Sequence, residues 1–143
     1  MTTMNCLVFI VLFLQLVLPC PKIVGSEDGG NGCSRQCQSA FCSVPPLLKY
    51  GKYCGVGYTG CPGEVPCDGL DGCCQAHDFC VQQKNDDLLS QSCNNSLLDC
   101  LAVFKATGAP GFLGNTCNTE NVEDLIHHII QAATWTGKII NHP

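Results

Sequence analysis

The sequence predicts a small, mainly α-helical domain held together by disulfides, with two antiparallel cross-linked helices, a glycine-rich loop before them and a C-terminal helix. Three observations support this fold class. The 143 residues include 14 cysteines. Three long stretches beyond residue 69 lack proline, and the last carries apolar residues at helical spacing. No alternation of apolar and polar residues indicates strands. A chain of this length buries a modest core, so cystine cross-links are expected to supply part of its stability.

Residues 1–26 are predicted to be a signal peptide, with an approximate cleavage site before Glu27. The apolar run Leu7–Leu18 is interrupted only by Gln15, and small residues follow at positions 24–26. The run is too short for a membrane span and lacks flanking charge, which disfavours the alternative of a retained membrane anchor. We therefore expect secretion, with residues 27–143 forming one domain.

Cysteine count and net charge narrow the class of protein further. Cleavage would remove Cys6 and Cys20 and leave twelve cysteines, an even number that predicts six disulfides formed in an oxidising compartment. The net charge of -5 argues against nucleic acid as a partner and offers no polybasic patch for anionic membranes. With no repeats and no linker, the chain is expected to form one compact domain, and we also expect it to be a monomer.

The first part of the mature chain is expected to be mostly irregular. Cysteines four residues apart between Cys33 and Cys42 are compatible with one or two helical turns, which Pro45 and Pro46 would end. From Tyr50 to Gly69, six glycines and two prolines exclude regular structure. This glycine-rich loop would expose many backbone carbonyl and N–H groups.

Three helices are predicted to follow. The first covers Leu70 to about Lys84, and the second covers Leu88 to Lys105. The third is amphipathic and starts at a cap formed by Asn118 or Thr119. Its apolar residues recur three and four positions apart: Val122, Leu125, Ile126, Ile129, Ile130 and Ala133. His127 and His128 lie on its polar face and are interpreted as solvated surface.

Cysteine spacing predicts how the first two helices pair. Cys73 and Cys80 are two turns apart on one face of the first helix, and Cys93 and Cys100 have the same spacing on the second. For antiparallel helices, bridges Cys73–Cys100 and Cys80–Cys93 have one consistent register. The two bridges would form a cross-linked seam between the helices.

His77 and Asp78 point in different directions from this seam. His77 shares the face of Cys73 and Cys80, so it faces the second helix, either as a functional group or as a satisfied core histidine. Asp78 lies about 100° round the helix, one turn after Cys74, and faces the region where the glycine-rich loop would pack. A carboxylate beside free backbone carbonyls favours a hard cation such as calcium.

Zinc is the competing ion at this position. Cys73, Cys74, His77 and Cys80 would be its ligands, but these thiols are expected to be oxidised and their spacing matches no common zinc pattern. The aspartates do not follow EF-hand spacing either. A cation beside a base that activates water is typical of a hydrolase.

The motif CCQAHDFC, preceded by YGKYCGVGYTGC, resembles the active site and calcium-binding loop of secretory phospholipases A2. The insertion CPGEVPCDGLDGCC, the twelve mature cysteines and the absence of an amphipathic N-terminal helix resemble the plant low-molecular-weight branch of that family. The specific resemblance extends from Tyr50 to Cys100. It implies calcium-dependent hydrolysis of the sn-2 ester of glycerophospholipids at a membrane surface, releasing a fatty acid and a lysophospholipid.

The resemblance also implies residue roles. His77 would be the general base, and the Gly55 N–H would stabilise the oxyanion. Ca²⁺ would be bound by the Asp78 carboxylate and by the backbone carbonyls of Tyr53, Gly55 and Gly57. Cys54 would pair with Cys74. The pairing of the other six cysteines does not follow: Cys33, Cys37, Cys42, Cys61, Cys67 and Cys117.

One position departs from the animal members of the family, where an aspartate after the first cysteine of the second helix hydrogen-bonds the histidine. Here that residue is Asn94, which can orient an imidazole but cannot stabilise its charged form as a carboxylate would. Asp99 is expected to lie away from the histidine. Asn94 also begins a glycosylation sequon, but a position in the seam disfavours a glycan.

Several further assignments stay open at this stage. Phe41, Leu47 and Leu48 could line an acyl-chain slot or belong to the core. Asp68 and Asp71 are candidates for favourable charge at the start of a helix. A catalytically silent binding domain on the same scaffold is the main alternative function, and a metal-free structural cystine-rich protein is the third. The combination of His77, Asp78 and the loop favours the enzyme.

Overall fold

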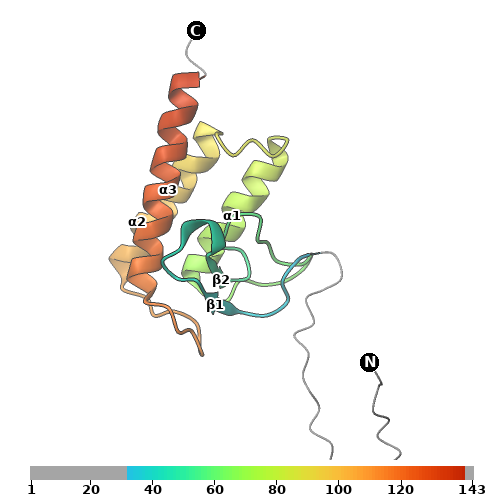
Figure 1. The fold of residues 1–143 in the computed structure, drawn as a ribbon, viewed down its shortest axis with the longest axis vertical. Helices are drawn as coiled ribbons and strands as arrows, with labels where there is room; N and C mark the ends of the chain where they lie inside the picture. The colour runs from blue at the N-terminus through green and yellow to red at the C-terminus, as the bar shows by residue number, and fades with distance from the viewer. Residues whose placement is uncertain (1–31, 141–143) are drawn as a thin grey trace, which may run out of the picture.

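The computed structural model describes residues 32–140, so the predicted signal peptide, residues 1–26, lies outside the described residues. The described part is mainly helical, as predicted, and also contains a two-stranded sheet (Figure 1). Its elements in chain order are β1 (Gln38–Ala40), the 3₁₀ helix η2 (Pro45–Leu47), β2 (Lys49–Gly51), α1 (Gly69–Gln83), α2 (Gln91–Thr107) and α3 (Thr119–Ile140).

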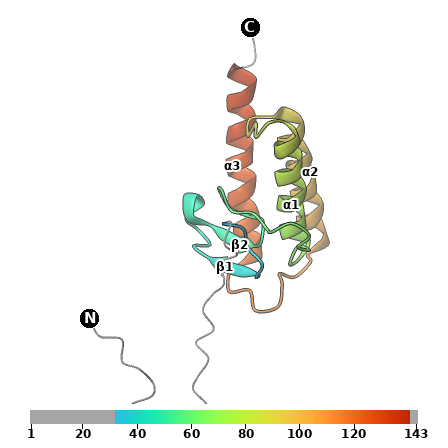
Figure 2. The same cartoon turned by 90° about the vertical axis from the view of Figure 1, so that its right-hand side faces the viewer.

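The three helices run side by side in alternating directions (Figures 1 and 2), with α2 packed against both α1 and α3. The small sheet lies at the end where α1 and α3 begin, and the α1–α2 turn lies at the other end with the last turns of α3. The core lies between these elements and includes Leu70, Leu97, Leu101, Val122 and Ile126. None of the helices in residues 32–140 is both long and apolar enough to cross a bilayer.

Local side-chain contacts set where each helix begins. Asp68 caps α1, where its Oδ1 accepts the Asp71 N–H at 2.9 Å. Asn118 caps α3 in the same way, through the Asn121 N–H at 2.9 Å. α2 starts three residues later than predicted because Asp87 Oδ1 accepts the Leu89 N–H at 3.0 Å and holds this segment in a turn.

The prediction of helical turns between Cys33 and Cys42 is wrong. Residues Gln38–Ala40 instead form β1, which pairs antiparallel with β2. The pairing also makes Tyr50 and Gly51 regular, although the sequence predicted an irregular loop from Tyr50 onward. Disulfides to distant segments hold the first segment extended: Cys33–Cys61, Cys37–Cys67 and Cys42–Cys117.

The other three disulfides surround the first helix. Cys73–Cys100 and Cys80–Cys93 join α1 to α2 along the seam. Cys54–Cys74 joins the glycine-rich loop to the adjacent face of α1. Neighbouring cysteines 73 and 74 therefore cross-link α1 in two directions, to a helix on one side and to a loop on the other.

Removal of the Cys42–Cys117 bridge is expected to destabilise the domain more than removal of Cys80–Cys93. The first bridge closes a sequence separation of 75 residues and the second closes one of 13. Loop-closure entropy predicts losses of about 4.5 and about 3 kcal/mol respectively when both cysteines of a pair become alanine. Urea unfolding of the two double variants under oxidising conditions measures the difference. Equal losses, or the reverse order, would show that native contacts rather than chain entropy dominate.

Candidate active site

His77 is held by an amide on the opposite helix. Its Nε2 lies 2.8 Å from Oδ1 of Asn94, which is 0% exposed. Asn94 Nδ2 donates to the Leu88 carbonyl at 3.1 Å. Because a carbonyl only accepts, the NH₂ end of the amide must face Leu88, and Oδ1 is left to accept from His77 Nε2–H. The neutral ring then carries its proton on Nε2.

The other ring nitrogen of His77, Nδ1, has no hydrogen-bond partner within residues 32–140. The half-buried ring borders a small cavity between the two seam disulfides, together with Ala76, Ser96 and Leu97. A ring with one nitrogen fixed and the other free can take up a proton, so its surroundings do not satisfy it fully.

Asp78 lies one residue further along α1 and has an unmatched oxygen. Its Oδ2 is buried and has no hydrogen-bond partner in the described part of the chain. Burial raises the pKa of this carboxyl to about 7, against the lowering effect of a hydrogen bond with the Thr59 side chain; the nearby Asp71 charge raises it further. A buried carboxylate in this state needs either a proton or a cation.

The glycine-rich loop brings backbone oxygens to this side of α1, where Cys54–Cys74 attaches it. Gly55 has φ +154°, and a Cβ there would lie 2.2 Å from the Leu48 carbonyl oxygen, so only glycine fits. The Gly55 N–H has no acceptor among residues 32–140, while its carbonyl accepts the Tyr58 N–H at 3.3 Å. The loop therefore offers an unused backbone donor.

The available donors suit calcium and exclude the zinc alternative. Cys73, Cys74 and Cys80 are all in disulfides, so no thiolate is free to bind zinc. No group of three or more histidine, cysteine or acidic side chains in residues 32–140 could hold a metal. A cation here must rely on one carboxylate and backbone carbonyls, which is a hard-oxygen donor set of the kind that calcium accepts.

Sequence reasoning missed the main contribution of Asp71. This residue is fully buried, and its carboxylate accepts three backbone N–H groups, from Lys52 at 3.0 Å, Tyr53 at 2.8 Å and Cys67 at 2.9 Å. Desolvation raises its pKa and these hydrogen bonds oppose the rise. A Cβ at Gly51 would lie 2.1 Å from Asp71 Cγ, so glycine makes room for the carboxylate. The helical spacing of positions 71, 74 and 78, which share one face, was the signal that could have revealed it.

The insertion between Cys61 and Cys67 also contacts the glycine-rich loop and stabilises it. Lys52 Nζ donates to Glu64 Oε2 at 2.6 Å and to the Val65 carbonyl at 3.1 Å, and the hydrogen bond with Lys52 lowers the pKa of Glu64. The Glu64 carbonyl accepts the Tyr53 hydroxyl at 2.7 Å and Gln75 Nε2 at 3.1 Å. Tyr53 is thus held through its backbone N–H by Asp71 and through its hydroxyl by the Glu64 carbonyl.

The remaining candidates from the sequence lie elsewhere. Leu48 belongs to the core, whereas Phe41 and Leu47 are exposed. Asp68 Oδ2 accepts the Tyr50 hydroxyl at 2.6 Å, so Asp68 supports the base of the sheet as well as capping α1. Asp99 is exposed on α2 and makes no hydrogen bond to His77.

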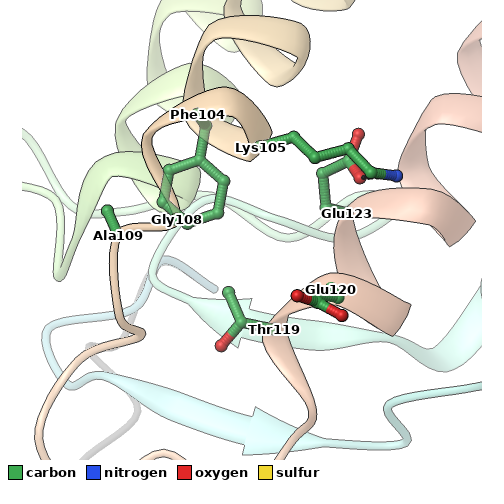
Figure 3. Close-up of a pocket in the computed structure, with 7 residues that line it drawn as sticks. All are labelled: Phe104, Lys105, Gly108, Ala109, Thr119, Glu120 and Glu123. Carbon is green, nitrogen blue, oxygen red and sulfur yellow. Dashed lines mark ion pairs between the residues drawn. The ribbon is translucent and has the colours of Figure 1, made fainter.

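A cavity between the end of α2 and the start of α3 contains none of the predicted site residues. Its lining is Phe104, Lys105, Gly108, Ala109, Thr119, Glu120 and Glu123. Lys105 extends from α2 across to the buried Glu123 of α3 (Figure 3), with Nζ 3.0 Å from Oε2. In this cavity the charges of Lys105 and Glu123 are therefore paired with each other. The cavity has no base positioned like His77.

Comparison with known proteins gives consistent relatives, although no protein-family model matches the chain. Phospholipase A2-alpha of Arabidopsis thaliana is 53% identical over 111 residues, covering 78% of this chain and 75% of the relative. Phospholipase A2 homolog 3 of Oryza sativa is 49% identical over 126 residues, covering 84% and 76%. A solved rice phospholipase A2 matches with a TM-score of 0.72 and 49% identity over 77% of this chain and 88% of that one. A rice phospholipase A2 in complex with octanoic acid matches with the same TM-score and identity, over 77% and 94%. This chain belongs to the phospholipase A2 family, in its plant secretory type, and is an enzyme that hydrolyses phospholipids.

Proposed function

We propose that the enzyme hydrolyses the sn-2 ester of glycerophospholipids in a calcium-dependent reaction. The observation that carries this proposal is the pair of unmatched groups on α1, the buried Asp78 Oδ2 and the free His77 Nδ1 on the next side chain. The Asp78 carboxylate could be neutralised by a bound cation, and His77 Nδ1 could accept a proton. Products would be a free fatty acid and a lysophospholipid.

Four residues would hold the calcium ion. Asp78 would bind it through its carboxylate, and Tyr53, Gly55 and Gly57 through their carbonyl oxygens. When bound, calcium would supply the positive charge that polarises the ester carbonyl and holds the substrate phosphate. The contacts of Asp71 and Glu64 support this assignment, because Asp71 holds the backbone N–H of Tyr53 and the Glu64 carbonyl holds its side-chain hydroxyl before any ion binds.

His77 and Gly55 would act on the reacting groups. His77 would take a proton at Nδ1 from the attacking water, directly or through a second water, while Asn94 holds the proton on Nε2. The unused Gly55 N–H would donate to the oxyanion, a contact of a type whose loss typically costs about 2.7 to 4 kcal/mol of barrier. The proton would then pass from His77 to the leaving alkoxide.

The setting of the reaction is also part of the proposal. We infer a secreted monomer that contacts phospholipid membranes peripherally. Val56, between the two proposed glycine ligands, is 67% exposed and places an apolar side chain beside the site. Six disulfides support an oxidising compartment. The octanoic acid bound by a rice relative is a fatty acid, the chemical class of one proposed product.

Fatty acid release from mixed phospholipid vesicles tests the function. The disulfide-bonded protein should release sn-2 fatty acid with calcium and stop when a chelator is added. His77→Ala should be inactive while keeping the wild-type circular dichroism spectrum and calcium affinity. No calcium-dependent release by the folded wild type would instead support a catalytically silent binding domain.

Replacing Asn94 with aspartate tests the assigned partner of His77. A carboxylate beside Nε2 stabilises the imidazolium, so the acidic limb of the kcat/KM profile should move to higher pH by about one unit. The new carboxylate would also face the Leu88 carbonyl, so some loss of stability is expected. Steady-state kinetics between pH 5 and 9 on the folded variant measures the shift, and an unchanged profile would count against Asn94.

A further inference from the structure

An asparagine partner creates a problem of orientation that a carboxylate would not have. The two ends of an amide are nearly equal in size but opposite in hydrogen bonding. If the Asn94 side chain turned over, its NH₂ group would face His77 Nε2 and force that nitrogen to accept. The ring proton would then move to Nδ1, the nitrogen that the proposed function needs as the base.

The Leu88 carbonyl opposes this inversion, because it accepts from Asn94 Nδ2 at 3.1 Å. It belongs to the α1–α2 turn rather than to a helix, and Asn85 and Asp86 in this turn have left-handed φ values of 57° and 61°. A turn of this kind does not hold a carbonyl as firmly as a helix does. The orientation of the amide therefore depends on what supports the turn.

The last turns of α3 supply that support. Gln91 Nε2, at the start of α2, donates to the Thr134 carbonyl at 2.8 Å. A Cβ at Gly137 would lie 2.6 Å from the Leu89 carbonyl oxygen and 2.6 Å from Gln91 Nε2. Glycine is unfavourable inside a helix, but at this position it lets the backbone of α3 lie directly on the turn. Figure 1 shows this end of α3 beside the α1–α2 turn.

We propose that Gly137 and Gln91 are positioning residues for catalysis, which act by holding the Leu88 carbonyl and thereby selecting the His77 tautomer with the proton on Nε2. The inference rests on the proposed function, in which His77 Nδ1 is the base. The sequence of contacts runs from α3 to the turn, from the turn to the Asn94 amide, and from the amide to the imidazole. Neither positioning residue needs to touch substrate.

Nitrogen NMR of protein labelled with ¹⁵N at histidine reads the tautomer directly, with His77→Ala used to assign the signals. The wild type should show one neutral tautomer at His77, with the proton on Nε2. Gly137→Ala should give a mixture of tautomers, with kcat lowered about tenfold or more and KM changed little. Lys138→Ala, an exposed neighbour on the same helix, is the matched control and should match the wild type.

Gln91→Met is the second variant, because it removes the donor to Thr134 without adding bulk beside α3. It should shift the tautomers in the same direction. In an Asn94→Asp background both side-chain oxygens accept, so Gly137→Ala should lose much less activity there. A purely structural role for Gly137 predicts the same loss in both backgrounds.

The outcomes separate the two proposals. Wild-type tautomer and kcat in both Gly137→Ala and Gln91→Met would overturn this inference, and an inactive His77→Ala would leave the proposed function standing. A shifted tautomer with full activity would overturn the catalytic role of the positioning residues. If His77→Ala were then also active, the proposed function would fail.

Discussion

Asp78→Asn should abolish calcium binding and phospholipid hydrolysis while making the calcium-free protein more stable. The variant loses the carboxylate proposed to bind the ion, so activity should fall at least 10²- to 10³-fold. The gain in stability arises because the ionised Asp78 Oδ2 is buried with no hydrogen-bond partner among residues 32–140. A neutral side chain of the same size removes that penalty, which the rise in pKa from 3.8 to about 7 puts at up to about 4 kcal/mol at pH 8.

The pH dependence of this effect has a definite sign. The pKa of Asp78 in the folded, calcium-free protein is raised to about 7 from 3.8. Between these values the folded state retains a proton that the unfolded chain has released. Raising the pH therefore destabilises the wild type by up to about 1.4 kcal/mol per unit, and the loss is complete above pH 7.

Urea unfolding of wild type and Asp78→Asn at pH 5 and pH 8, each with chelator and with calcium, measures both effects. The variant should exceed the wild type in stability at pH 8 with chelator, and the difference should shrink at pH 5. Calcium at 100 times its Kd should restore about 2.7 kcal/mol to the wild type and nothing to the variant. A variant that is less stable than calcium-free wild type at pH 8 would show that Asp78 Oδ2 has a partner in solution.

Asp71→Ala should produce the largest loss of stability among single substitutions near the site. It leaves three backbone N–H groups without an acceptor, two of them from the buried residues Lys52 and Tyr53. An unsatisfied buried donor costs about 1–3 kcal/mol, so the two buried donors together are expected to cost about 2–6 kcal/mol. Calcium affinity should also fall at least tenfold, because the backbone around Tyr53 is no longer fixed.

Thermal unfolding of Asp71→Ala measures the loss of stability. Calorimetric titration of the folded variant with calcium at 15 °C measures its calcium affinity. Asp99→Ala is the matched control, since it removes an exposed carboxylate from α2 and should change neither quantity. Asp71→Asn keeps one acceptor oxygen and should fall between the two. Wild-type calcium affinity in a folded Asp71→Ala protein would mean that the ion itself, rather than this carboxylate, shapes the loop.

The sequence predicted the helices and the seam because both depend on local periodicity. Positions 73, 80, 93 and 100 repeat every two turns, so their pairing follows once the helices are antiparallel. The first segment was mispredicted for the opposite reason. Its cysteines pair with residues 28 to 75 positions away, and nothing local distinguishes an extended segment from a helical one.

The candidate site also contains residues that local spacing predicts and residues that only distant contacts explain. His77, Asp78 and Asn94 stand at fixed helical positions and could be identified from spacing and resemblance. The support from Asp71 depends on the path of the glycine-rich loop, whose conformations are set by close contacts at Gly51 and Gly55. The contact of Gly137 with the α1–α2 turn links residues almost fifty positions apart, and no periodic pattern marks it.

The two directions in which Cys73 and Cys74 cross-link α1 mean that the proposed base, His77, and the proposed cation ligand, Asp78, are aligned by one rigid piece of backbone. His77 and Asp78 repeat, one turn later, the angular step between those two cysteines. In the proposed reaction, a single helical rotation would therefore set both the direction of proton uptake and the position of the cation. Selective reduction of Cys54–Cys74 would release the loop and leave the histidine oriented, so under the proposed function calcium affinity should fall while the proposed base stays in place.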